Sequence, residues 1–249
     1  MNNILSIKNL SKKYYSKDSE ILAIKDITLD VKENDFIAIV GPSGCGKSTL
    51  LSILSKIDKQ TNGTIEYPSG PKKVGYMFQQ DCLFPWLTIL DNCLLGLKIK
   101  KKLTPQKKEK VIDLLKKYGL KKFINKYPSS LSGGMKQRVA LIRTLAIEPD
   151  ILLLDEAFSA LDYQTRLTVS DDVYKIIKKE KKTVIMVTHD VGEAVSMANK
   201  VIILTNRPST IKKVININLT DANSPINNRK SKEFMNYYNE IWENIDNHV

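Results

Sequence analysis

Apolar residues along this chain follow two spacings, and each spacing predicts one kind of element. Short apolar runs, continuous or alternating, predict strands, whereas apolar residues at every third or fourth position predict helices. The predicted strands are Ile4–Leu10, Ile27–Val31, Phe36–Val40, Gly63–Tyr67, Val74–Phe78, Ile151–Leu154, Thr183–Val187 and Val201–Leu204. The predicted helices are Leu50–Ile57, Pro105–Gly119, Ser132–Ile147, Tyr163–Lys179, Val191–Ala198 and about Arg229–Ile245. A polar loop is expected over Lys13–Ile21.

The order of these elements predicts an α/β fold. The opening third reads as strands, the residues from Thr88 to about Ile147 follow helical spacing, and strands and helices alternate after that. The strands Ile151–Leu154, Thr183–Val187 and Val201–Leu204 are almost continuously apolar, as parallel strands covered on both faces should be. We therefore expect an α/β core with an inserted helical subdomain.

The glycine-rich segment after the strand Phe36–Val40 predicts a phosphate-binding loop. Its sequence GPSGCGKST fits the pattern G-x-x-x-x-G-K-[ST], and it lies between a predicted strand and a predicted helix. Backbone amides of the loop and of the helix N-terminus can then surround one phosphate group. Lys47 would meet the β- and γ-phosphates, and Ser48 would offer a hydroxyl to Mg²⁺. The predicted ATP-binding residues of this loop are Gly41, Pro42, Ser43, Gly44, Cys45, Gly46, Lys47, Ser48 and Thr49.

Two acidic residues follow a buried strand and add a second part of the site. Asp155 and Glu156 come directly after Ile151–Leu154, at the strand end where open α/β sheets bind ligands. A carboxylate at Asp155 can hold Mg²⁺, and one at Glu156 can polarise an attacking water. Without the phosphate-binding loop, the same two acids could simply begin a surface loop.

A third segment, LSGGMKQR from Leu131, leads to a family resemblance. Ser132, Gly133 and Gly134 stand where the next predicted helix begins, so they can also bind an anion. Together with Gln137 and Arg138 this segment resembles the signature motif of ATP-binding cassette (ABC) ATPases. The resemblance implies that it contacts ATP held by a second ATPase subunit, so that two identical chains would sandwich two ATP molecules.

The resemblance assigns further residues across positions 4 to about 220. Gln79 resembles the glutamine that ligates Mg²⁺ and senses the membrane partner. The segment Ser159–Asp162 resembles the D-loop of the dimer interface, and His189 resembles the switch histidine beside the γ-phosphate. Tyr14 resembles the aromatic residue that stacks on adenine, with Tyr15 as the open alternative. The implied catalytic residues are therefore Glu156 and His189, the metal ligands are Ser48, Gln79 and Asp155, and the cofactors are ATP and Mg²⁺.

The resemblance also refines the fold. It implies a P-loop NTPase core of the ABC type, with an N-terminal antiparallel β-subdomain and a helical subdomain at about 80–148. The ATPase domain would span residues 1–220, and residues 221–249 would form a C-terminal helical tail.

Two segments point to a subfamily. Leu83-Phe84-Pro85-Trp86 resembles a segment of nitrate, sulfonate and taurine importer ATPases, although an ordinary buried turn is the alternative. Thr205–Ile211 resembles the Arg-Pro-Gly-Arg-Ile of that group, but Ser209 and Thr210 replace the glycine and the second arginine. The implied partners are integral-membrane permease subunits, an extracytoplasmic solute-binding protein and a second ATPase subunit. The subunit would lie on the cytoplasmic face of the membrane.

Composition fits this interpretation. The 249 residues are 42% hydrophobic and 27% charged, which is typical of a globular protein. The longest apolar runs are far shorter than the roughly 18 residues of a membrane-spanning helix, and Met1–Lys8 lacks the apolar block of a secretory signal. We therefore expect a cytosolic chain. Three cysteines without a C-x-x-C pair and two histidines predict no zinc site.

The net charge of +12, from 39 Lys and Arg against 27 Asp and Glu, leaves one rival open. A basic chain can bind nucleic acid or an anionic membrane, or can come from a lysine-rich proteome. Aromatic residues do not interleave with the lysine runs, so the sequence favours no nucleic-acid partner. The rival is a soluble ABC-type ATPase that acts on nucleic acid or ribosomes.

One cysteine carries an expectation of its own. Cys45 lies inside the phosphate-binding loop, near a helix N-terminus and Lys47. Both neighbours favour a thiolate, so we expect a depressed pKa and ready reaction with thiol reagents if the side chain is exposed.

Overall fold

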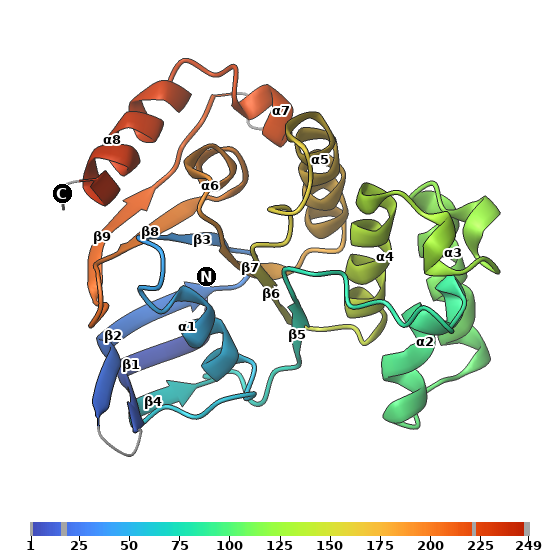
Figure 1. Ribbon diagram of the computed structural model, residues 1–249, viewed down its shortest axis with the longest axis horizontal. Coiled ribbons are helices and arrows are strands. Elements are labelled where there is room, and N and C mark those ends of the chain that lie inside the picture. The colour runs from blue at the N-terminus through green and yellow to red at the C-terminus, as the bar shows by residue number, and fades with distance from the viewer. Residues whose placement is uncertain (1, 16–18, 221–222, 247–249) are drawn as a thin grey trace.

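The computed structural model describes residues 2–15, 19–220 and 223–246 (Figure 1). Its strands are β1 (Asn3–Tyr15), β2 (Glu20–Lys32), β3 (Phe36–Val40), β4 (Asn62–Glu66), β5 (Val74–Met77), β6 (Ile151–Asp155), β7 (Thr183–Val187), β8 (Lys200–Leu204) and β9 (Ile211–Asn216). Its α-helices are α1 (Lys47–Leu54), α2 (Ile89–Ile99), α3 (Pro105–Lys117), α4 (Gly133–Ala146), α5 (Tyr163–Lys179), α6 (Val191–Met197), α7 (Pro225–Asn228) and α8 (Phe234–Asp246). Two short 3₁₀ helices cover Lys121–Phe123 and Pro128–Ser130.

A six-stranded sheet in the order β5-β6-β7-β3-β8-β9 forms the centre of the molecule. Its first five strands are parallel, and β9 closes one edge antiparallel to β8. Alternate residues of β3 face opposite sides: Phe36 and Ala38 join a core with α4, α5, α6 and α8, whereas Ile37 and Ile39 join a core with α1, β1 and β2. The sheet is therefore covered on both faces, as its continuous apolar strands predict.

The N-terminal antiparallel β-subdomain is a three-stranded sheet in the order β2-β1-β4. The polar loop expected over Lys13–Ile21 is wrong, because both strands of the hairpin continue through most of it. Lys13 pairs with Leu22, and Tyr15 pairs with Glu20. Tyr15 and Glu20 are exposed at this end of the hairpin, so the segment shows no continuous apolar run, and its strand structure comes from pairing between β1 and β2. The rest of the expected loop, residues 16–18, lies outside the described residues.

The inserted helical subdomain contains α2, α3 and α4 around a core of its own, on the right of Figure 1. Thr88 caps α2 by accepting a hydrogen bond from the Asp91 amide at 3.0 Å. Thr104 caps α3, with Pro105 in the first turn, where its missing N–H costs nothing. The α/β fold with an antiparallel β-subdomain and inserted helices is confirmed.

The C-terminal elements pack back onto the core. Instead of one helix from Arg229 to Ile245, a short α7 ends at Asn228 and α8 begins at Phe234. Phe234 and Ile241 are buried against the core that contains α6. The strand β9 is not among the predicted strands, because the lysines in its sequence IKKVIN break the apolar run. Among the described residues, no helix combines the length and apolar character needed to cross a membrane.

Candidate functional site

A cavity of about 480 Å³ opens beside the phosphate-binding loop, at the carboxyl ends of the parallel strands. This is the edge at which open α/β sheets bind ligands. The loop follows β3, while two of the lining residues follow β6 and β7. The cavity is lined by Ser43, Gly44, Gly46, Lys47, Ser48, Thr49, Glu156, His189 and Arg207.

The phosphate-binding loop has the backbone that an anion cradle requires. Gly44 and Gly46 have φ angles of 72° and 114°, in the left-handed region that favours glycine. Gly46 is the N-cap of α1, and the first-turn residues Lys47, Ser48 and Thr49, whose amides lack partners within the helix, line the cavity. The Lys47 ammonium donates to the carbonyls of Gly41 and Pro42, each at 2.8 Å. The loop thus holds its own cation in place.

The structure brings Ser48 and Asp155 into direct contact. The Ser48 hydroxyl donates to one carboxylate oxygen of Asp155 at 2.9 Å, and the Tyr76 hydroxyl donates to the other at 2.7 Å. Burial, and secondarily this hydrogen bond to Asp155, raise the pKa of Tyr76. Tyr76 lies on β5 and was not identified from sequence, because only the parallel pairing of β5 with β6 places it beside Asp155.

Glu156 and His189 line the cavity, and Gln79 contacts Glu156 from outside the lining. One Glu156 oxygen lies 3.3 Å from His189 Nδ1 and accepts a hydrogen bond from the Gln79 amide at 3.2 Å. The Glu156 backbone has φ of 45°, unusual for a residue with a side chain, and its amide donates to the Val187 carbonyl at 2.9 Å. Strained backbone of this kind is concentrated at functional sites. The side chains of Glu156 and His189 remain 25% and 54% exposed, so they are open to a ligand.

The signature segment lies apart from this cavity. Ser132 caps α4 by accepting a hydrogen bond from the Met135 amide at 3.4 Å. Gly133 and Gly134 are the first two residues of α4, and so do not precede the helix. A Cβ on Gly134 would lie 2.8 Å from Val169 of α5, so the glycine lets the two helices approach. None of these three residues is among those lining the described cavity.

The two adenine-stacking candidates also lie outside the cavity lining. Tyr14 donates a hydrogen bond to Asp58 at 3.0 Å, and the Lys12 ammonium lies 4.7 Å from the centroid of its ring. The Tyr15 side chain is strongly exposed. The choice between the two tyrosines therefore stays a prediction.

Comparison with known proteins decides the family. Residues 24–159, more than half of the chain, match the family model of ABC transporters. The chain belongs to the ABC transporter ATP-binding proteins. This confirms the resemblance deduced from the motifs, and it makes the protein an ATPase subunit.

Relatives and solved structures agree with this assignment. The uncharacterized ABC transporter ATP-binding protein YtlC of Bacillus subtilis is 41% identical over 97% of this chain and 95% of its own length. The aliphatic sulfonates import ATP-binding protein SsuB of Bacillus anthracis is 38% identical over 87% of each chain. The nitrate import ATP-binding protein NrtD of Synechocystis sp. is 38% identical over 95% of this chain and 93% of its own length. The dimeric ATP-binding cassette MJ0796, solved with ADP and Pi in a post-hydrolysis state, superposes with a TM-score of 0.73 at 33% identity, over 86% of this chain and 99% of its own.

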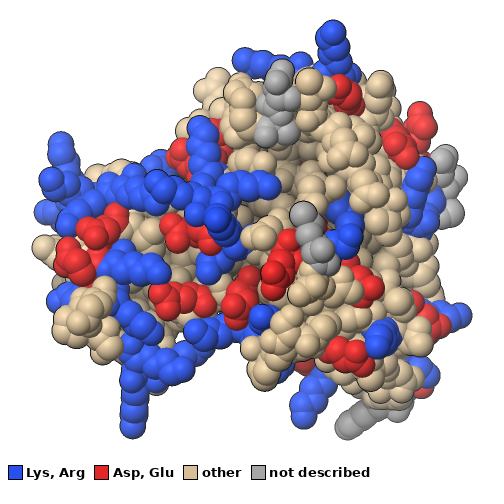
Figure 2. All heavy atoms as spheres, turned by 180° about the vertical axis from the view of Figure 1, so that it is seen from behind, with Lys and Arg blue, Asp and Glu red and all other residues tan. Residues whose placement is uncertain are grey.

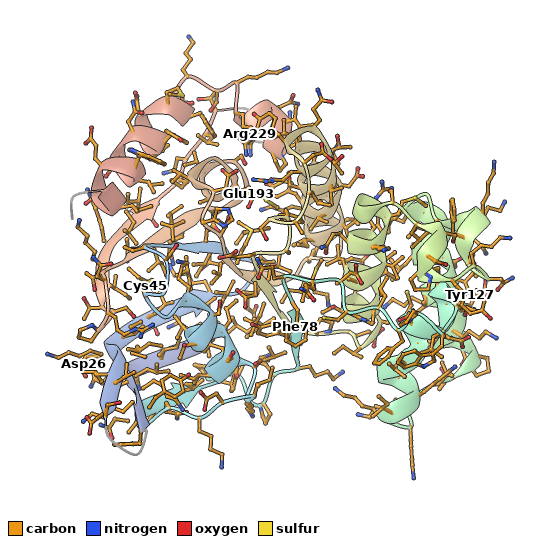
Figure 3. The ribbon with its side chains drawn as sticks, in the orientation of Figure 1. Asp26, Cys45, Phe78, Tyr127, Glu193 and Arg229 are labelled. Carbon is orange, nitrogen blue, oxygen red and sulfur yellow. The ribbon has the colours of Figure 1, made fainter. Side chains whose placement is uncertain are left out.

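The expected pKa of Cys45 in this cassette is wrong. Cys45 is 1% exposed and belongs to the core that contains β1, β2 and α1; Figure 3 labels its position. Burial raises the pKa of the thiol, although the Lys47 ammonium 3.9 Å away acts in the opposite direction. Burial disfavours the charged thiolate, and this effect on the pKa is larger than the opposite effect of the nearby Lys47 ammonium. The sequence shows the neighbours of Cys45 along the chain but not the side chains packed over it.

Arg207 is a residue of the site that was not predicted from the sequence. Its guanidinium donates to the Gly44 carbonyl at 2.6 Å and lines the cavity. The loop that carries it is fixed to β2, because the backbones of Ser209 and Ala23 are hydrogen-bonded and the Lys25 amide donates to the Ser209 carbonyl. The sequence of this loop suggested only a subfamily.

Proposed function

We propose that this cassette is the ATP-hydrolysing subunit of an importer, and that it energises uptake of a small solute such as a sulfonate, taurine or nitrate through separate membrane subunits. The observation that carries the ATPase role is that Lys47, Ser48, Glu156 and His189 line one cavity, with Asp155 hydrogen-bonded to Ser48 and His189 beside Glu156. The class of solute is supported by two relatives, which are named as import proteins for aliphatic sulfonates and for nitrate.

The proposed reaction is attack of water on the γ-phosphorus of ATP, with cleavage of its bond to ADP. The Glu156 carboxylate would polarise the water and accept its proton, since its exposed oxygens face the cavity. His189 would orient both the water and the γ-phosphate from its position against Glu156. Lys47 and the loop amides would stabilise charge on the phosphate oxygens, so catalysis is mainly positioning and electrostatics.

The residues around Ser48 and Asp155 fit Mg²⁺. The Ser48 hydroxyl, on the cavity lining, lies 2.9 Å from the Asp155 carboxylate, and Mg²⁺ prefers such oxygen ligands, completed by phosphates and water. Among the described residues, His, Cys, Asp and Glu form no cluster that could hold a metal without a substrate. Gln79 fits the role of a Mg²⁺ ligand less directly, because its side-chain amide is held by hydrogen bonds from its nitrogen to Glu156 and Ser159. When bound, Mg²⁺ would neutralise phosphate charge.

A second copy would complete the site. The signature residues Ser132 and Gly133 are exposed at the start of α4 but do not line the cavity of their own chain. A free helix N-terminus suits an anion, so we propose that these residues contact ATP held by a partner subunit. The dimeric arrangement of the similar cassette MJ0796 supports this proposal.

The segment between Gln79 and α2 is the proposed docking site for a membrane subunit. Phe84 and Trp86 are 37% and 70% exposed, and their ring centroids lie 5.3 Å apart. Asn92 fixes the segment by hydrogen bonds to the backbones of Phe84, Leu87 and Thr88. The exposed rings contradict the alternative of an ordinary buried turn. Leu94 belongs to the helical core and cannot be part of the docking surface.

The surface charge gives less support to a nucleic-acid partner. Figure 2 shows Lys and Arg side chains over the helical subdomain, with Asp and Glu among them. Several of these lysines are paired: Lys98 with Asp91, Lys110 with Glu148, and Lys116 with Asp113. Lysines paired in this way offer less charge to a phosphate backbone than a continuous basic stripe.

Replacing Trp86 with alanine tests the docking proposal. The loss of one large exposed anchor at an interface costs about 2 kcal/mol or more, so assembly with the membrane subunit should weaken about thirtyfold and transport should fail. The isolated subunit should keep its basal ATPase activity and its melting temperature. Pull-down with the membrane subunit and uptake in proteoliposomes measure the two effects.

The chain offers a matched control in its second tryptophan. Trp242 is 49% exposed and lies on α8, which packs on the core that contains α6 and not on the helical subdomain's core. Trp242→Ala should assemble and transport normally. Intact assembly in Trp86→Ala would refute the docking site, and equal losses in both variants would show a general effect of removing exposed tryptophans.

A further inference from the structure

A buried polar cluster holds the segment that carries His189. Glu193 of α6 is only 4% exposed, and one of its carboxylate oxygens accepts a hydrogen bond of 2.7 Å from the Thr188 hydroxyl. That hydroxyl in turn accepts a hydrogen bond of 3.0 Å from the Asp190 amide. Both neighbours of His189 along the chain are therefore held by a hydrogen-bonded cluster whose residues do not line the cavity.

Asp190 connects this cluster to the D-loop. Its carboxylate caps α6 by accepting a hydrogen bond of 2.9 Å from the Glu193 amide. Its other oxygen lies 3.3 Å from the guanidinium of Arg166, which also donates to the Leu161 carbonyl at 3.0 Å. The backbone on both sides of His189 thus depends on one network of buried and half-buried charges.

A second guanidinium enters the cluster from the C-terminal segment. Arg229 follows α7, and Figure 3 shows it directed from that helix toward α6, which carries Glu193. A Cβ added to Gly192 would lie 2.6 Å from Arg229 Nη1 and 3.2 Å from its Cζ. The guanidinium therefore packs on the bare backbone of Gly192, within the first turn of α6, where a larger residue would exclude it.

The segment that presents Arg229 is itself anchored. The Asn228 side chain donates to the Ser196 carbonyl at 2.6 Å, at the other end of α6. On the opposite side, the Ile226 amide donates to Asp171 of α5 at 3.4 Å. The Phe234 ring, at the start of α8, lies 5.9 Å from the guanidinium. Arg229 is thus placed by contacts with three helices.

The charges in the cluster depend on one another. Burial raises the pKa of Glu193, and the Asp190 carboxylate acts in the same direction. The Thr188 hydroxyl, Arg166 and Arg229 oppose this by stabilising the carboxylate. Removing one cation from such a group leaves a buried charge poorly compensated, so the surrounding backbone must rearrange.

We propose that Arg229 is a positioning residue for hydrolysis: through Gly192, Asp190 and Glu193 it fixes the segment that holds His189 against Glu156. The C-terminal segment is then part of the hydrolytic machinery, although none of its described residues lines the cavity. This inference rests on the proposed role of His189 beside the γ-phosphate. Misplacing a catalytic group by about 1 Å can cost about a hundredfold in rate, so the effect should be large enough to measure.

The kinetic test uses Arg229→Gln and Gly192→Ala in the full-length chain. Glutamine removes the charge, whereas alanine keeps every charge, favours the helix and displaces the guanidinium with one methyl group. Both variants should lower the kcat of ATP hydrolysis about tenfold or more, in keeping with a displaced catalytic group, with the KM for ATP within about twofold of wild type. Arg229→Lys should recover part of the rate. The control Lys230→Gln changes an exposed neighbour and should behave as wild type.

A spectroscopic readout separates positioning from a merely structural role. The chain has two histidines, so His248→Asn leaves His189 as the only source of imidazole NMR signals. In that background, Arg229→Gln should shift the His189 signals in the folded, nucleotide-free protein, and Lys230→Gln should not. A fall in kcat with unshifted His189 signals would make Arg229 a structural residue only and overturn the proposal.

His189→Ala distinguishes failure of this inference from failure of the proposed function. Wild-type turnover in His189→Ala would remove the premise that His189 acts in hydrolysis. Loss of turnover in His189→Ala, together with unchanged kcat and unchanged His189 signals in both Arg229→Gln and Gly192→Ala, would overturn the role of Arg229 alone.

Discussion

Replacing Glu156 with glutamine is expected to abolish ATP hydrolysis while leaving ATP binding intact. Glutamine keeps the volume of the side chain and can still contact Gln79 and His189, but its amide cannot accept a proton from water. The loss of a general base costs about 10²–10⁴ in kcat. Because the proposed contacts with the phosphates come from the loop amides and Lys47 rather than from Glu156, the affinity for ATP should change little.

Three measurements on Glu156→Gln check this expectation. Phosphate release should fall at least a hundredfold, within the range expected of a general base, and calorimetry should give a dissociation constant for ATP close to wild type. Gel filtration should show a stable dimer with MgATP where wild type dissociates after turnover. The control Glu243→Gln, on the exposed part of α8, should hydrolyse normally. Wild-type turnover in Glu156→Gln would remove Glu156 from the reaction.

Replacing Lys47 with alanine should instead weaken ATP binding itself. Lys47 is 7% exposed and its ammonium is hydrogen-bonded to the carbonyls of Gly41 and Pro42, so it organises the loop in addition to its proposed contact with the phosphates. Hydrogen bonds that involve charged groups contribute about 1.5–3 kcal/mol. Loss of this cation should therefore raise the dissociation constant for ATP about ten- to a hundredfold, with hydrolysis falling in parallel.

Titration with a fluorescent ATP analogue measures this loss, and Lys25→Ala provides the control. The Lys25 side chain is exposed on β2, near the loop of Arg207 but not in the cavity lining. That variant should bind as tightly as wild type. Unchanged affinity in Lys47→Ala would show that Lys47 does not contact nucleotide.

Much of the fold follows from local sequence. Thr183–Val187 and Tyr163–Lys179 have the predicted bounds, because each is a run of one spacing with clear ends. The N-cap of α3 follows from Thr104 before Pro105. The solvent-exposed end of the β1–β2 hairpin and the strand β9 could not be predicted from local sequence. Their residues are polar or mixed, and they are strands because a neighbouring strand pairs with them.

The site residues also divide into those that a sequence motif predicts and those that only the fold brings together. Lys47 and Ser48 share one short motif, and Asp155 and Glu156 share another, so the sequence identifies them and the fold brings the two motifs together. Tyr76, Arg207 and Arg229 reach their partners only through strand pairing or helix packing. These contacts could not be predicted from the spacing of residues along the chain.

The most direct test of the account is solute-stimulated ATPase activity in proteoliposomes that contain the subunit, its membrane subunits and their solute-binding protein. We expect taurine, an alkanesulfonate or nitrate to stimulate hydrolysis, and Glu156→Gln to abolish that stimulation. Stimulation by DNA or ribosomes instead, with no response to any solute in the assembled complex, would contradict the importer function.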